Sequence, residues 1–363
     1  MQNLTGALGR RVARGVGLLS LVALAACESS TGPESTRTLD PNLALGDYQV
    51  MDKILATDAL AGFRALGGRS GMGTSSAMEL AGRIADARDG SGARDLTLQL
   101  ARQLSGAAAT KEILSARLRG MTLVYDPAKD TYIVNPSRTG APANGVRFVT
   151  YEVDAAGKPV PSQESGYADF LDEGATTGET IALRLKVVHE GATHLDYRTR
   201  LTFAGETGSI SVDGFMSDGT SRLDFDVDVS SRKSGAATLL DADFDLQVKA
   251  REFSIQGRAR GINEGTGDGT VGMTVRHAAS SVAVSMTGSS GTIAGTIEVN
   301  GRLLATAAGN AKSPTLTGPN GGPLTGGELL MVLHIVDTTD RVFDLVEDLV
   351  KPAGILVVLG WLL

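Results

Sequence analysis

Two histidines, His189 and His194, come closest in this sequence to a metal-binding pattern. They flank the residues Glu190-Gly191-Ala192-Thr193, and a His-Glu start is typical of zinc peptidases. In that motif the second histidine follows the first by four residues, which puts both on one helix face, whereas here the spacing is five. The flanking residues alternate between apolar and polar, which predicts a hairpin. Pairing its apolar faces puts the two histidines on opposite sides of a sheet, so we predict no metal site there.

Aspartates occupy alternate positions in two consecutive strand-like runs. The six residues are Asp224, Asp226, Asp228, Asp241, Asp243 and Asp245. If the two strands pair, carboxylates face carboxylates, which costs stability unless a cation lies between them. Arg258 and Arg260 can neutralise one flank, and Ca²⁺ prefers clustered carboxylate oxygens. We expect a solvated acidic face here and keep a calcium site as the alternative.

The other patterns do not add up to a catalytic site. The sequence has no Gly-x-Ser-x-Gly nucleophile elbow. His277 lies close to Ser280 and Ser281 but across a predicted turn, with no third partner. The glycine-rich residues 67–74 lack the lysine of a phosphate-binding loop. We therefore predict no catalytic residue, and any acid–base chemistry would rest on carboxylates.

The first residues have the three zones of an export signal. Arg10, Arg11 and Arg14 give a positive start, and the apolar residues 16–26 follow. This apolar run is too short to cross a bilayer as a helix but suits a signal peptide. It ends at Cys27, which is the only cysteine of the chain, so the sequence predicts no disulfide framework and no cysteine-ligated metal.

The residues Leu24-Ala25-Ala26-Cys27 resemble the lipobox of bacterial lipoproteins. The resemblance covers about the first 27 residues and implies cleavage before Cys27, whose sulfur then receives a diacylglyceryl group. Two or more acyl chains are enough for stable membrane anchoring. Glu28 follows the cysteine, where the best-known family members retained in the inner membrane have Asp, so the resemblance favours the outer membrane of the cell envelope.

Composition favours a turn-rich β protein and argues against nucleic-acid binding. Without residues 1–26 the chain has 31 basic and 41 acidic residues, a net charge of −10. Phosphate binding needs a basic face, so we expect no nucleic-acid partner. Glycine is abundant, with 46 residues, and aromatic residues make up 4%. Together with short alternating runs, this composition is typical of antiparallel β proteins.

We expect five segments along the chain. Residues 1–26 are the signal peptide, and 27–46 are the lipidated cysteine with a Ser-, Thr- and Pro-rich tether. Residues 47–120 have apolar side chains at helical spacing, and 121–320 alternate as an antiparallel meander. Residues 321–363 predict an amphipathic helix and an apolar tail. We expect residues 47–363 to fold as one domain.

Several hairpins of the meander can be predicted individually. Residues 126–130 are expected to connect two strands, and residues 180–308 to contain about nine strands. Asn300-Gly301 suits a type I′ turn. A two-residue loop at Ala250-Arg251 gives a register that matches apolar residues with each other and opposite charges with each other. Its predicted pairs are Val248–Phe253, Leu246–Ile255, Phe244–Gly257, Lys249–Glu252, Asp243–Arg258 and Asp241–Arg260.

The expected fold class is therefore mainly β: a large antiparallel meander or half-barrel with N-terminal helices and a C-terminal amphipathic helix. An apolar stripe defines that last helix, made of Leu329, Leu330, Leu333, Val336, Val342, Phe343, Val346, Leu349 and Val350. A sheet that is apolar on one face needs a cover, which the helices can provide. This architecture is loosely similar to the LolA/LolB and LppX-type lipid-carrier lipoproteins, without a shared motif that would assign binding residues.

We accordingly expect a lipid-anchored, non-enzymatic protein of the cell envelope. It is either structural or binds a hydrophobic small molecule or lipid between sheet and helices, and no cofactor is predicted. The alternative is an envelope hydrolase that uses carboxylates, with Ca²⁺ as its possible ion.

Overall fold

The computed structural model of this protein describes the strand-rich part of the chain. The described residues are 50, 53–54, 57, 114, 116–174, 180–205, 207–235, 237–263, 266, 268–311, 313–333, 335–336, 339 and 342. The predicted signal peptide, Cys27, the tether and most of the predicted helices of 47–120 lie outside these residues. Within them the chain is mainly β, as predicted, and a helix follows the last strand.

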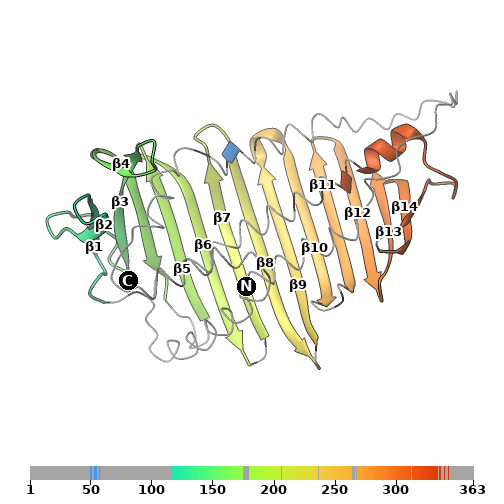
Figure 1. The fold of residues 1–363 in the computed structure, drawn as a ribbon, viewed down its shortest axis with the longest axis horizontal. Helices are drawn as coiled ribbons and strands as arrows, with labels where there is room; N and C mark the ends of the chain where they lie inside the picture. The colour runs from blue at the N-terminus through green and yellow to red at the C-terminus, as the bar shows by residue number, and fades with distance from the viewer. Residues whose placement is uncertain are drawn as a thin grey trace. The chain divides into compact units, whose positions relative to one another are not determined.

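Fifteen strands form one open sheet (Figure 1). Their bounds are β1 Met121–Asp126, β2 Thr131–Val134, β3 Gly145–Val153, β4 Pro159–Asp172, β5 Thr180–His189, β6 Ala192–Ala204, β7 Thr207–Ser217, β8 Arg222–Ser234, β9 Ala237–Val248, β10 Phe253–Asn263, β11 Gly269–His277, β12 Ser280–Ser289, β13 Thr292–Val299, β14 Arg302–Asn310 and β15 Thr315–Thr317. From β3 to β15 every strand lies beside its chain neighbour, which confirms the predicted meander. At the other end β1 lies between β3 and β2, parallel to β3 and antiparallel to β2.

Tight turns of the predicted type connect some strands. Asn300 and Gly301 both have positive φ, 51° and 71°, and Val299 pairs with Arg302. Positive φ at both central residues is the type I′ geometry, whose twist matches that of the flanking strands. The Asn300 side chain also accepts a hydrogen bond from the Ser281 backbone N–H at 2.8 Å. The predicted turn is confirmed.

The β9–β10 hairpin has the predicted register but a different loop. The pairs Val248–Phe253, Leu246–Ile255, Phe244–Gly257 and Asp243–Arg258 are all present. The connection is a four-residue loop, however, in which Lys249–Arg251 form a 3-10 turn and Glu252 adopts a left-handed conformation with φ 52°. The prediction of a two-residue loop was wrong, because Ala-Arg does not suit the positive φ values that such a loop requires.

A β-bulge also removes one predicted charge pair from this hairpin. The register shifts between Ala259 and Ile262, so that Arg260 and Gly261 together oppose Asp241. Arg260 then donates to Asp243, while Asp241 accepts from the Gly261 backbone N–H at 2.6 Å. The predicted Asp241–Arg260 pair is therefore wrong, because a bulge inserts one residue and breaks the alternation.

The chain divides into two compact units, one that includes Val50–Asp226 and one that includes Val227–Leu349. In each unit one face of the sheet carries buried apolar side chains. In the first unit these pair across β5 and β6 as Ile181–Leu201, Leu185–Tyr197 and Val187–Leu195. Full burial of such a side chain contributes about 1.5–3 kcal/mol, so these rows fix the register.

The helix after β15 starts with a capping box. The Thr325 side chain accepts a hydrogen bond from the Glu328 N–H at 3.3 Å, and Glu328 accepts one from the Thr325 N–H at 2.9 Å. Helical residues run from 326 to 333 and include 335, 336, 339 and 342. The predicted amphipathic helix is present as far as the described residues extend.

The buried stripe of this helix differs from the predicted one. Val332, Ile335, Thr339 and Val342 are buried, while Leu330 is 71% exposed. Apolar spacing identified Val342 correctly but missed Val332 and Ile335, because the region offers more apolar residues than one helix face can bury. The members of the predicted stripe beyond Val342 lie outside the described residues.

Candidate functional site: the two faces of the sheet

The apolar face of the first unit contains one polar side chain in its middle. Thr199 of β6 lies directly opposite Leu183 of β5 and Val212 of β7, and all three are 0% exposed. Along its own strand, Tyr197 and Leu201 point to the same side and are also buried. We call this set of side chains on β5–β7 the apolar face of the first unit.

Within the part of the chain that the structure describes, the Thr199 hydroxyl has no hydrogen-bond partner. A buried hydroxyl without a partner costs about 1–3 kcal/mol. Valine would fit the same strand position without that cost, so a threonine here is an exception to the pattern of its neighbours. The apolar face therefore presents a hydroxyl group between the aliphatic side chains of Leu183 and Val212.

The second unit builds its apolar face from β9 to β13 in the same way. Leu246 and Ile255 pair and are both 0% exposed. The Phe244 ring lies over Gly257, where an added Cβ would come within 1.9 Å of the ring. The ring thus fills the space that the glycine leaves, a device that stabilises glycine positions in sheets.

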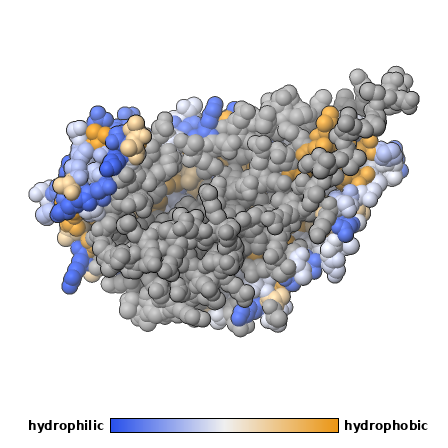
Figure 2. Space-filling model, in the orientation of Figure 1, coloured by the Kyte–Doolittle hydropathy of each residue, from blue (hydrophilic) through white to orange (hydrophobic). Residues whose placement is uncertain are grey.

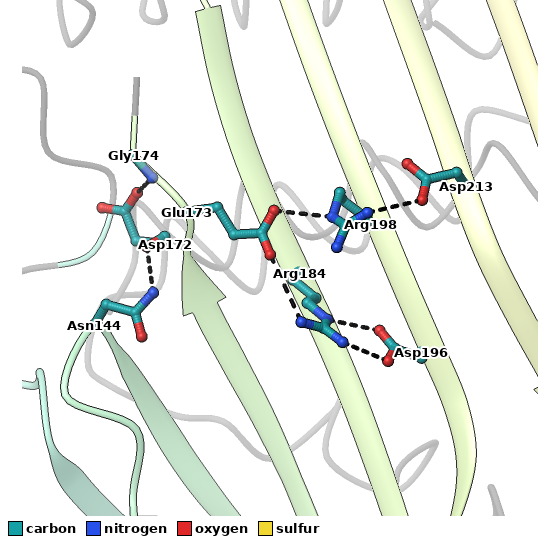
Figure 3. Close-up of polar contacts among 8 residues, drawn as sticks. All are labelled: Asn144, Asp172, Glu173, Gly174, Arg184, Asp196, Arg198 and Asp213. Atoms are coloured by element: carbon teal, nitrogen blue, oxygen red, sulfur yellow. Dashed lines mark hydrogen bonds and ion pairs between the residues drawn. The ribbon is translucent and has the colours of Figure 1, made fainter. Parts of the chain in front are cut away.

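The opposite face of the first unit carries a network of ion pairs (Figure 3). Arg184 of β5 and Arg198 of β6 stand directly opposite each other, which by itself is repulsive. Glu173, just after β4, contacts both, at 3.9 Å to Arg184 and 3.0 Å to Arg198. Arg184 also makes a bidentate pair with Asp196 at 2.7 and 2.6 Å, and Arg198 contacts Asp213 at 3.1 Å. The hydrogen bond to Asp196 raises the pKa of Arg184 above its ordinary value, so this guanidinium stays charged.

The network is tied to the chain reversal after β4. The Asp172 carboxylate accepts from the Gly174 N–H at 2.9 Å and from Arg119 at 3.1 Å. Its backbone carbonyl accepts from Asn144 at 2.8 Å (Figure 3). The carboxylates of Asp172, Glu173 and Asp196 are thus each held by an arginine. This arrangement fits a role in fixing the strands rather than proton transfer.

A second bidentate pair connects the neighbouring strands β3 and β4. Arg147 of β3 donates to both oxygens of Asp169 of β4 at 2.7 Å, and Asp169 is 7% exposed. The guanidinium also lies 3.6 Å from the centre of the Tyr167 ring. The hydrogen bond with Asp169 raises the pKa of Arg147.

The six predicted aspartates lie at the polar positions of β8 and β9, between buried apolar residues. On the sheet, Asp224 pairs with Arg222, Asp241 with Arg232, and Asp243 with Arg258 and Arg260, while Asp245 accepts hydrogen bonds from Gln247 and Gln256. Asp226 and Asp228 are exposed on β8. Among the residues that the structure describes, no group of three or more His, Asp or Glu side chains could hold a metal ion.

The two histidines of the β5–β6 hairpin lie together, contrary to the prediction. Their ring centroids are 5.7 Å apart, with the ring planes at 86°. The register shifts by one residue between Val187 and Val188, which gives β6 an extra residue and breaks the alternation that would separate them. The alternating pattern did not reveal this bulge.

The other histidine candidate of the sequence, His277, belongs to the second unit. His277 lies opposite Ser280 across a two-residue turn. The centroid of its ring is 6.3 Å from the centroid of the Phe253 ring. Thr199 and the Glu173 network were not singled out from the sequence. The polar alternation of Arg184, Asp196 and Arg198 could have suggested the network, but Glu173 joins it from outside the strands.

Comparisons with protein-family models, curated proteins and solved structures find no match for this chain. Of the helices described by the structure, none has both the length and the apolar character needed to cross a membrane.

Proposed function

We propose that this protein is a lipid-anchored, non-enzymatic protein of the cell envelope that binds a hydrophobic ligand on the apolar face of its sheet. The ligand class is a molecule with an aliphatic chain, held between the sheet and the helical segments. The observation that carries this proposal is the aliphatic composition of the apolar face in the first unit, with Leu183, Leu201 and Val212 at its centre.

The charged side chains support a binding role over a catalytic one. The arginines and carboxylates of the β4–β7 network compensate one another through short ion pairs. General acid–base catalysis needs a group that can exchange a proton near neutral pH. The carboxylate oxygens of Glu173 and Asp196 are instead engaged by the guanidinium groups of Arg198 and Arg184.

The Thr199 hydroxyl fits the same proposal. A fatty acid or acyl ester has one polar group beside a long apolar chain. A hydroxyl within an aliphatic surface can donate a hydrogen bond to such a group while the chain packs on its neighbours. Thr199 thereby suggests where on the apolar face the polar group of the ligand lies.

The anchor part of the proposal rests on Cys27 and its lipobox. In a bacterial host with the lipoprotein pathway, we expect the purified protein to begin at Cys27 and to carry the mass of its acyl chains. The Cys27→Ser variant should lack that mass and leave the membrane fraction. A wild-type chain with an unmodified cysteine would contradict the anchor.

Native mass spectrometry of the chain from Glu28 onward tests ligand binding. We expect an added mass of several hundred daltons that organic solvent releases and that is identified as a lipid. Purified fatty acid added to the delipidated chain should restore a complex of defined stoichiometry. A bare chain that takes up no fatty acid would refute the binding role and favour a structural one.

A further inference from the structure

The end of the β5–β6 hairpin brings two imidazole rings into one small space. His189 is the last residue of β5, and His194 lies at the register shift near the start of β6. The residues directly opposite His189 are Gly166 on β4 and Ala192 on β6, which have only a hydrogen atom and a methyl group as side chains. Bulges often re-aim a side chain in this way next to functional sites.

The distance between the rings suits a shared metal ion. Two imidazole nitrogens bound to one Zn²⁺ at about 2.0–2.1 Å in tetrahedral geometry place the ring centroids roughly 5 Å apart, and at most about 6.5 Å. The observed separation of 5.7 Å lies within this range. The His189 ring, at the end of its strand, could therefore reach an ion held by His194 through rotation of its own side chain, without movement of the strands.

The orientation of His194 is already fixed from the far side of its ring. Its Nδ1 lies 3.0 Å from the backbone carbonyl oxygen of Ser217, and the side chain is 7% exposed. A carbonyl accepts from Nδ1–H and leaves the lone pair on Nε2, the arrangement found behind metal-binding histidines. The carbonyl itself belongs to a tight turn, in which Ser217 donates to the Ser221 carbonyl at 2.9 Å.

We propose that His189 and His194 form a binding site for a divalent transition-metal ion that prefers imidazole nitrogen, represented by Zn²⁺. In the described part of the chain no third His, Asp or Glu completes a larger cluster. The remaining coordination positions are accordingly filled by water or by an exogenous ligand. The choice of donors also separates this site from a calcium site, because Ca²⁺ takes oxygen ligands. This site is independent of the proposed lipid binding.

Isothermal titration of the full chain with Zn²⁺ tests the site through matched substitutions. His194→Asn keeps a donor toward the Ser217 carbonyl but removes Nε2, and His189→Asn removes the second ligand. His277→Asn is the control, because His277 also ends a strand at a tight turn but contacts Phe253 instead of a histidine.

We expect saturable binding of one Zn²⁺ in the unmodified chain and a rise in Kd of at least about 10-fold in both His189→Asn and His194→Asn. His277→Asn should bind as the unmodified chain does. Circular dichroism without metal checks that each variant is folded, and His189→Asn alone decides the case if His194→Asn fails to fold. The proposal is overturned if the unmodified chain shows no saturable Zn²⁺ binding, or if His189→Asn binds as tightly as the unmodified chain.

Discussion

Glu173→Gln is the sharpest test of how the β4–β7 ion-pair network stabilises the sheet. Arg184 and Arg198 stand directly opposite each other on neighbouring strands. Glu173 contacts both, at 3.9 and 3.0 Å. Glutamine has nearly the same shape and keeps an acceptor oxygen, so the substitution removes the negative charge and little else. Among the described residues, the two arginines then keep one carboxylate partner each, Asp196 for Arg184 and Asp213 for Arg198.

The expected loss of stability follows from the geometry and exposure of these side chains. Arg184, Arg198 and Glu173 have 32%, 37% and 26% of their side chains exposed, so solvent screens their charges. An ion pair of this kind contributes about 0.2–1 kcal/mol, and the longer contact to Arg184 belongs at the low end. With the unrelieved repulsion between the arginines, we expect a total loss of about 1 kcal/mol. For a domain of this size that lowers Tm by about 2–4 °C.

Thermal unfolding at low and high salt distinguishes this electrostatic effect from a packing effect. In 1 M NaCl the Debye length falls to about 3 Å, so the difference in Tm between Glu173→Gln and the unmodified chain should shrink by about half or more. Glu164→Gln is the matched control, because the Arg138–Glu164 pair is more exposed, at 46% and 40%, and involves one arginine. An equal loss at both salt concentrations, or a larger loss in Glu164→Gln, would refute the reasoning.

Substitutions at four further positions test buried hydroxyls, core packing and the helix cap. Thr199→Val should raise the free energy of unfolding by about 1–3 kcal/mol in urea titrations, because it removes a buried hydroxyl without a partner. Thr122→Val, which removes a second such hydroxyl, should act in the same direction, and a loss in both variants would show that the hydroxyls are bonded in solution. Gly257→Ala should cost about 1–3 kcal/mol, because its Cβ would lie 1.9 Å from the Phe244 ring; combining it with Phe244→Ala should cost less than the sum of the two single changes. Thr325→Ala should cost about 1 kcal/mol through loss of the capping box, with Thr325→Ser as the neutral control; equal urea midpoints for the two would contradict it.

Much of the sheet could be predicted because its apolar residues alternate strictly. In the β9–β10 hairpin the alternation fixed four residue pairs correctly, since a slip by one residue would turn every apolar side chain to the wrong face. The turn at Asn300-Gly301 could also be predicted from the sequence, because few other residue pairs adopt positive φ at both positions.

The strand β4 escaped prediction for a physical reason. It begins at Pro159, includes Pro161 and has a polar stretch of exposed residues before the apolar Ala168 and Phe170. Proline cannot donate to the ladder and normally argues against a strand. The pairing of β3 with β4 tolerates it because the register shifts near Tyr151 and Val153, where irregular hydrogen bonding leaves room for residues without an N–H.

The errors at possible functional residues have a common origin in the bulges. At Arg260-Gly261 a bulge moves an arginine from Asp241 to Asp243, and on β6 a register shift brings His194 beside His189. Alternation is a reliable guide to which side chains enter the core, because burying a charge on the wrong face is costly. Alternation is a poor guide to which polar side chains contact one another. One extra residue in a strand moves the following side chains to the opposite face, and near the end of a strand this costs little because few side chains are affected. The proximity of His189 and His194 therefore follows from the strand register and could not be predicted from their spacing in the sequence. The Zn²⁺ titration of His189→Asn tests whether the two rings bind a metal ion together.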